Sequence, residues 1–154
     1  MIVCLCLLST AALAADSKPY FNSRFNYQID LPSELKTVSE ADNGDGITLE
    51  SADGKAKLAV WGAYIMQDNF KQESDSRHTY YVHDGWKLSY EKHSATWASF
   101  SGSLKDRILY VRHIVLCDDA IGMFSIEYPK AEQKHYGEIV DGLVKSFKSG
   151  GKCQ

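Results

Sequence analysis

The second half of the chain contains four closely spaced β-prone runs, and this feature restricts the possible fold most strongly. The runs are WKLSYEK (86–92), ATWASFSG (95–102), RILYVRHIVL (107–116) and IGMFSIEY (121–128). Their short connections favour an antiparallel meander, because a parallel pairing would need a long crossover. The third run is apolar on both faces, so we expect it to be a central strand covered on both sides.

After Pro129 the apolar residues change to a helical period. They recur three and four positions apart and are followed by two glycines: Tyr136, Ile139, Val140, Leu143, Val144 and Phe147. This spacing predicts an amphipathic helix from about 131 to 148, whose apolar stripe must cover a sheet face. A sheet followed by a covering helix is an α+β arrangement rather than a repeat of alternating strands and helices.

The first half of the chain adds strands and one further helix. FNYQIDL (25–31) alternates apolar and polar residues as a half-buried strand does. ITLES (47–51) and KAKLAVWGAYI (55–65) lie around an Asp-Gly turn, which is a hairpin signal. The polar run 68–80 predicts a mostly exposed helix. The predicted fold is α+β: an antiparallel sheet of about six to seven strands, covered by the C-terminal helix and a second, shorter helix.

The glycine- and aspartate-rich stretch NGDGITLESADGK (43–55) could be a calcium loop or two turns around a strand. A regular calcium loop needs oxygen ligands at fixed positions around its sixth residue, a glycine. If Gly46 is that glycine, Ala41 and Ala52 occupy two ligand positions, and the other registers also place apolar residues there. The stretch is therefore interpreted as turn, strand, turn.

The N-terminal residues resemble a secretory signal. MIVCLCLLSTAALAAD (1–16) is apolar and ends in small residues, which predicts a signal peptide over residues 1–14 with cleavage before Ala15. We expect a flexible segment over 15–24, a single domain over 25–150 and a tail over 151–154. The predicted location is periplasmic or secreted, without membrane insertion. The net charge of −3 argues against a nucleic-acid binder, which would need a basic face.

Two of the four cysteines remain after the predicted cleavage, Cys117 and Cys153. In an oxidising compartment this pair favours a disulfide. The alternative is a nucleophilic Cys117 activated by His113. Four positions along an extended strand separate two residues by about 13 Å, which disfavours direct activation.

Several of these runs resemble those of the PsbP/Mog-like superfamily. The opening strand FNYQIDLP (25–32), the central run TWASFSG (96–102) and the closing FSIEYP (124–129) carry the resemblance, together with the helix that follows. They are packing motifs, so the resemblance implies the fold, and it supplies no catalytic residues to this chain. Members differ in role, from photosystem-associated subunits to a partner of a small GTPase, and a shared fold does not transfer a role.

The remaining chemistry is sparse. The five histidines (His78, His83, His93, His113 and His135) have no zinc-site spacing, and we interpret them as scattered surface residues. No phosphate-loop, dinucleotide or nucleophile-elbow motif is present in the sequence. We therefore expect no cofactor, no metal site and no catalytic residues.

The aromatic residues of the middle of the chain offer the best functional hypothesis. Aromatic side chains with a polar group are favoured at protein interfaces, although a two-layer fold also needs them in its core. The predicted partner-binding residues are Tyr80, Tyr81, His83, Trp86 and Trp97. The predicted function is a non-enzymatic exported binding module that engages a protein or envelope component, in one specific form an inhibitor or immunity protein. The alternative is a small-ligand or metal-binding periplasmic protein.

Overall fold

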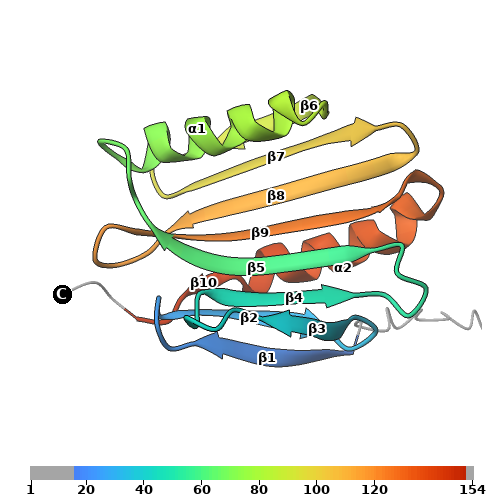
Figure 1. Cartoon of the computed structure of the whole chain (residues 1–154), viewed down its shortest axis with the longest axis horizontal. Helices are drawn as coiled ribbons and strands as arrows, with labels where there is room; N and C mark the ends of the chain where they lie inside the picture. Colours follow the sequence, from blue (N-terminus) through green and yellow to red (C-terminus); the bar gives the residue numbers. More distant parts are fainter. Residues whose placement is uncertain (1–15, 152–154) are drawn as a thin grey trace, which may run out of the picture.

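The computed structural model describes residues 16–151 and contains two antiparallel sheets and two long helices (Figure 1). The elements in chain order are β1 (Ser17–Asn22), β2 (Tyr27–Pro32), β3 (Lys36–Glu40), β4 (Gly46–Glu50), β5 (Lys57–Tyr64), α1 (Phe70–His83), β6 (Lys87–His93), β7 (Trp97–Leu104), β8 (Arg107–Val115), β9 (Ala120–Pro129), the 3-10 helix Lys130–Glu132, α2 (Gln133–Ser146) and β10 (Lys148–Ser149). This is the α+β fold that the sequence predicts. None of the helices in the described part of the chain is long and apolar enough to cross a membrane.

The large sheet has seven strands in the order β3-β4-β5-β9-β8-β7-β6. The predicted meander forms its second half, since β6, β7, β8 and β9 pair consecutively. The predicted hairpin of β4 and β5 then joins the sheet through β9, which pairs with β5 along its whole length. Strand β6 is left at one edge of the sheet and β3 at the other.

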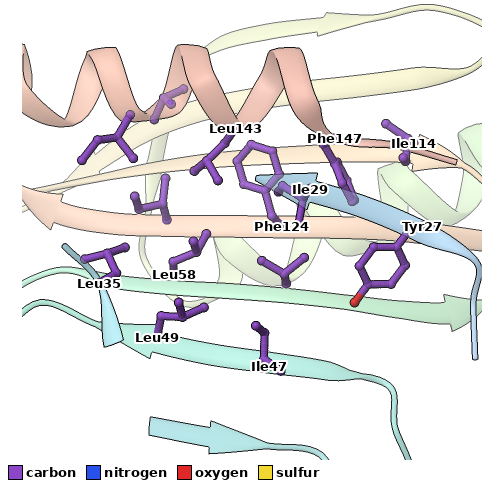
Figure 2. Packing of buried hydrophobic residues seen from close by; sticks show 14 of the residues in the cluster. Tyr27, Ile29, Leu35, Ile47, Leu49, Leu58, Ile114, Phe124, Leu143 and Phe147 are labelled. Atoms are coloured by element: carbon purple, nitrogen blue, oxygen red, sulfur yellow. The ribbon is translucent and has the colours of Figure 1, made fainter. Parts of the chain in front are cut away.

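The two faces of the large sheet are covered by different elements. Helix α2 and the small sheet β1-β2-β10 cover one face, and Figure 2 shows Leu143 and Phe147 from this layer meeting Phe124 and Leu58 of the large sheet. Helix α1 lies on the other face, where Phe70 packs against β7 and β9. The predicted apolar stripe of α2 is confirmed, since its buried residues are Tyr136, Ile139, Val140 and Leu143.

Three details differ from the sequence prediction. Residues 15–24, expected to be flexible, include strand β1, which pairs with β2 over its full length and adds Tyr20 to the core. Strand β1 lies at the edge of the small sheet and is mostly exposed, so it lacks the apolar alternation that marks a half-buried strand. The strand at 36–40 lies in a stretch for which the sequence predicts no strand. The second helix is not shorter, because α1 and α2 both have 14 residues.

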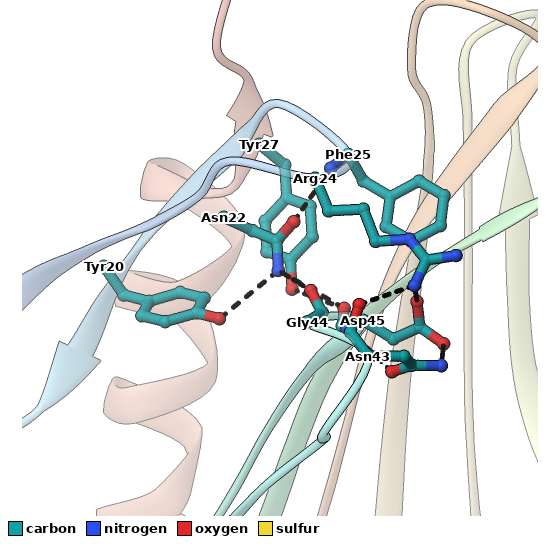
Figure 3. A network of polar contacts seen from close by, with 8 residues as sticks. All are labelled: Tyr20, Asn22, Arg24, Phe25, Tyr27, Asn43, Gly44 and Asp45. Atoms are coloured by element: carbon teal, nitrogen blue, oxygen red, sulfur yellow. Dashed lines mark hydrogen bonds and ion pairs between the residues drawn. The ribbon is translucent and has the colours of Figure 1, made fainter.

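The stretch 43–55 consists of turns around a strand, as predicted, and its first turn also holds the small sheet in place. Gly44 has a φ of +76°, a conformation that glycine adopts without strain. Figure 3 shows how this turn is used: the carbonyl oxygens of Gly44 and Asp45 accept hydrogen bonds from the side chains of Asn22 and Tyr27. Arg24 adds an ion pair with Asp45. The turn therefore fastens the β1-β2 hairpin to the large sheet.

Candidate partner-binding surfaces

The five predicted binding residues do not form a single patch. Tyr80 and His83 are exposed at the end of α1, and the side chain of Tyr80 has 69% of its surface accessible. Tyr81 is half-buried and meets the ring of Phe100 edge-on at 5.4 Å. Trp86 is buried, with 7% accessible. Trp97 packs with the core cluster on the α2 side of the sheet, on the face opposite to α1. Of the five predicted residues, Tyr80 and His83 are thus the two that are exposed side by side at the end of α1.

Trp86 fixes the end of α1 against the sheet. The helix ends at His83, Gly85 takes a φ of +93°, and the backbone N–H of Trp86 donates to the carbonyl of Tyr81. The indole then packs with Phe100, Leu109 and Val111. The aromatic pair Tyr81 and Trp86 therefore positions the surface that Tyr80 and His83 present.

A groove lies between this end of α1 and the edge strand β6. It has a volume of about 510 Å³ and is lined by Val82, Trp86, Leu88 and Tyr90, among others. The lining also includes the polar residues His78, Lys87, Ser89 and Glu91, and among its apolar residues Val82 has 50% of its surface accessible. No strand of residues 16–151 pairs with the outer edge of β6. We call these residues, with Tyr80 and the outer edge of β6, the α1–β6 groove.

Sequence reasoning missed Val82 and Tyr90 as members of this groove. Val82 is one apolar residue on a polar helix, and Tyr90 is one alternating residue of a strand. No local pattern sets them apart, because the groove arises only when α1 folds back beside β6. A distance of 3.6 Å between Nε2 of His78 on α1 and a carboxylate oxygen of Glu91 on β6 marks the same approach.

The inner face of α1 carries buried polar groups. The Oε2 atom of Glu73 accepts hydrogen bonds from the backbone N–H groups of Met66 and Gln67. Its Oε1 atom forms a salt bridge with Arg77 at 2.7 Å. Ser74 lies 2.8 Å from Nδ1 of His113 on β8. Each of these buried polar groups therefore has a partner, as buried polar groups require.

His113 is therefore not a surface histidine, contrary to the sequence interpretation. Its side chain has 1% of its surface accessible, because β8 is central and α1 covers it. Burial lowers the pKa of His113 to about 3, and the positive charge of Arg77 and the nearby His78 act in the same direction. The imidazole is neutral at physiological pH. A Ser–His pair enclosed in this way supports the packing of α1 against the sheet.

The other histidines do not converge on a metal site. His135 pairs with Glu34 at 2.8 Å on the α2 side, far in the fold from the His78–Glu91 pair beside α1. Within residues 16–151, no group of three potential ligands among His, Cys, Asp and Glu is placed to hold a metal ion. The predicted disulfide partner Cys153 and the predicted signal peptide 1–14 lie outside the described residues, so both stay predictions.

The architecture matches two solved structures across most of its length. Cyanobacterial PsbP (CyanoP) from Synechocystis sp. PCC 6803 superimposes with a TM-score of 0.66 at 12% identity, covering 92% of this chain and 98% of that one. The Ran-binding protein Mog1p of Saccharomyces cerevisiae gives a TM-score of 0.63 at 11% identity, covering 88% of this chain and 96% of that one. No protein-family model and no curated protein matches the sequence. The chain thus has the PsbP/Mog1 fold, which confirms the resemblance read from its strands.

Proposed function

We propose that this protein is a non-enzymatic, exported binding module that holds a partner protein in the α1–β6 groove. The observation that carries the proposal is the exposure of Tyr80 and Val82 next to a strand edge with no partner in the described chain. One specific form of this function is an inhibitor or immunity protein. The description of Mog1p as a Ran-binding protein supports the idea that this fold can serve protein recognition. Export rests on the signal-like residues 1–14.

An open sheet edge is suited to recognising an extended segment. The outer N–H and C=O groups of such an edge can pair with an added strand, and neighbouring side-chain pockets then select its sequence. Here the backbone of β6 offers the edge, and the groove offers a pocket in which apolar residues such as Val82 and Leu88 lie beside charged ones such as Glu91. Lys87 and Lys92 are exposed on the same strand, which protects the edge from indiscriminate pairing between copies.

The buried chemistry of the molecule supports a binding role. The Ser74–His113 pair is enclosed between α1 and the sheet, where a substrate cannot reach it. Glu73 and Arg77 are committed to each other and to the start of α1. These polar side chains are accounted for by the packing of the helix.

The proposal can be tested by photo-crosslinking in producing cells. A photoreactive phenylalanine analogue replaces Tyr80 in one variant and Val38 in another. Val38 lies on β3 at the opposite sheet edge and has 54% of its surface accessible, so it is a matched exposed position. We expect a discrete crosslinked protein from position 80 and none from position 38.

A second variant checks that the crosslink depends on the groove. Val82→Glu places a charge in the groove without removing a core residue, and Val38→Glu is its control at the other edge. The crosslink at position 80 should be lost with Val82→Glu and retained with Val38→Glu. Equal crosslinking at positions 80 and 38, or an adduct insensitive to Val82→Glu, would show that the partner does not use this groove.

A further inference from the structure

A second surface lies on strands β6, β7 and β8, on the face of the large sheet opposite to α1, and it shares Tyr90 of β6 with the α1–β6 groove. It is formed by side chains of β6, β7 and β8 on the α2 side of the large sheet. We call it the sheet-face site, and it comprises Tyr90, Lys92, Trp97, Ser99, Tyr110 and Arg112.

The strand register places these side chains in two adjacent rows. Lys92 of β6 is opposite Ser99 of β7, and Ser99 is opposite Arg112 of β8. Tyr90, Ser101 and Tyr110 form the next row in the same way. Neighbouring strands are about 4.8 Å apart, so Lys92 and Arg112 leave the backbone about 10 Å from each other. A small serine lies between two large side chains in each row.

Arg112 is held in place but has no carboxylate partner. Its guanidinium carbon lies 4.1 Å from the centre of the Trp97 ring, and its Nη1 atom donates to the hydroxyl of Ser99 at 2.9 Å. Tyr110 donates to the same hydroxyl at 3.1 Å. The Nε atom is buried without a hydrogen-bond partner among the described residues.

The other three arginines of the chain are paired differently. Arg24 lies 3.1 Å from a carboxylate oxygen of Asp45, Arg77 lies 2.7 Å from Glu73, and Arg107 lies 3.7 Å from Glu127. Arg112 is thus the exception among the arginines, and no ion pair to it is formed within residues 16–151.

The surroundings of Arg112 favour an incoming anion. Burial lowers the pKa of Arg112, while Tyr110 and Tyr90 act in the opposite direction, and the group keeps its positive charge at neutral pH. A half-buried guanidinium has lost much of its hydration, so a carboxylate that pairs with it replaces hydrogen bonds that water no longer supplies. Asp141 of α2 is the acidic group that acts on Tyr110, the neighbour of Arg112.

We propose that the sheet-face site binds an acidic peptide segment of a partner protein. Arg112, braced on Trp97, receives one carboxylate, and Lys92 receives a second from the same segment. The two residues leave the sheet about 10 Å apart, a spacing that suits two acidic side chains of one extended chain. The protein carries a net charge of −3, so an acidic partner gains no attraction from the overall charge and depends on local cations such as Arg112 and Lys92.

The test combines calorimetry with NMR of the full chain, using hexaglutamate as the probe at about 20 mM salt, where surface charges are weakly screened. We expect saturable shifts of the Trp97 indole N–H and of the Arg112 side chain. Arg112→Gln should weaken binding about tenfold or more, and Lys92→Ala should weaken it about three- to fivefold. Arg107→Gln on the same strand is the matched control, and it should leave the affinity within about twofold.

The outcomes separate this proposal from its rivals. Equal losses with Arg107→Gln and Arg112→Gln would indicate general electrostatic attraction and overturn it. Inorganic phosphate that produces the same shifts with the same affinity would reduce the site to a small-anion site and also overturn it. Lys92 is exposed, so Lys92→Ala keeps the test valid if Arg112→Gln fails to fold. The crosslinking at position 80 concerns the other face, so either proposal can fail alone.

Discussion

The buried His113 should make the stability of the protein fall as the pH is lowered from neutrality. In the folded state, burial lowers the pKa of His113 to about 3, whereas in the unfolded chain the imidazole has its ordinary value of 6.5. Above pH 6.5 both states hold a neutral imidazole. Below pH 6.5 the imidazole of His113 binds a proton in the unfolded state but stays neutral in the folded state. The free energy of unfolding therefore decreases as the pH falls, until about pH 3.

The size of this effect follows from linkage. One proton bound only by the unfolded state reduces the free energy of unfolding by about 1.4 kcal/mol per pH unit, which amounts to about 2 kcal/mol at pH 5. His113→Asn removes the titrating group and places an amide near the position of Nδ1, where it can still bond to Ser74. The variant should be less stable than the parent at pH 7, and the difference should shrink by about 2 kcal/mol by pH 5.

The measurement is urea denaturation followed by tryptophan fluorescence at several pH values between 7 and 5. Ser74→Ala is the control, because it removes the hydrogen-bond partner but leaves the imidazole buried, and burial is the main cause of the lowered pKa. Ser74→Ala should therefore keep the pH dependence of the parent. Parallel curves for the parent and His113→Asn would refute the reasoning.

Three further changes test the fold and the predicted disulfide. Trp86→Ala should reduce the free energy of unfolding by about 3–5 kcal/mol, because it empties a buried site, whereas Tyr80→Ala should change it by less than about 0.5 kcal/mol. Similar losses for the two variants in urea denaturation would contradict this placement. Glu73→Ala should reduce stability by about 3 kcal/mol, since it leaves a half-buried arginine and two backbone N–H groups without their acceptor. A loss below about 1 kcal/mol would argue against that role. Mass spectrometry of the exported protein after alkylation should show Cys117 and Cys153 joined by one bridge, and two alkylated thiols without prior reduction would disprove the pairing.

The strands, helix and turns that the sequence predicts correctly are those marked by a pattern of neighbouring residues. Alternation along β2 marks a strand because side chains of a strand point to opposite faces in turn, and the long apolar run of β8 marks a strand covered on both faces. The stripe of α2 marks a helix because its apolar residues recur at the helical period. Turns follow from residue chemistry in the same way, and Gly54 of the predicted Asp-Gly turn has a φ of +68°.

Helix α1 shows where local signals weaken. Its inward residues are Phe70, Ser74, His78 and Tyr81, which have the spacing of one helix face but mix apolar and polar types. A hydrophobic pattern cannot reveal such a face. The sheet supplies partners for the polar members, as in the contact between Ser74 and His113.

The sequence by itself determined the α+β class, the four-strand meander and the covering helix, because these depend on periodicities of neighbouring residues. The tertiary structure decided which side chains of each strand face α1 and which face α2, and which distant segments of the chain pack against each other. It placed Trp86 in the core and Trp97 on the opposite face, and it left Arg112 beside Trp97 without a carboxylate. These placements depend on strand register and on pairing between distant segments, for which the energy comes from contacts that no short stretch of the chain contains.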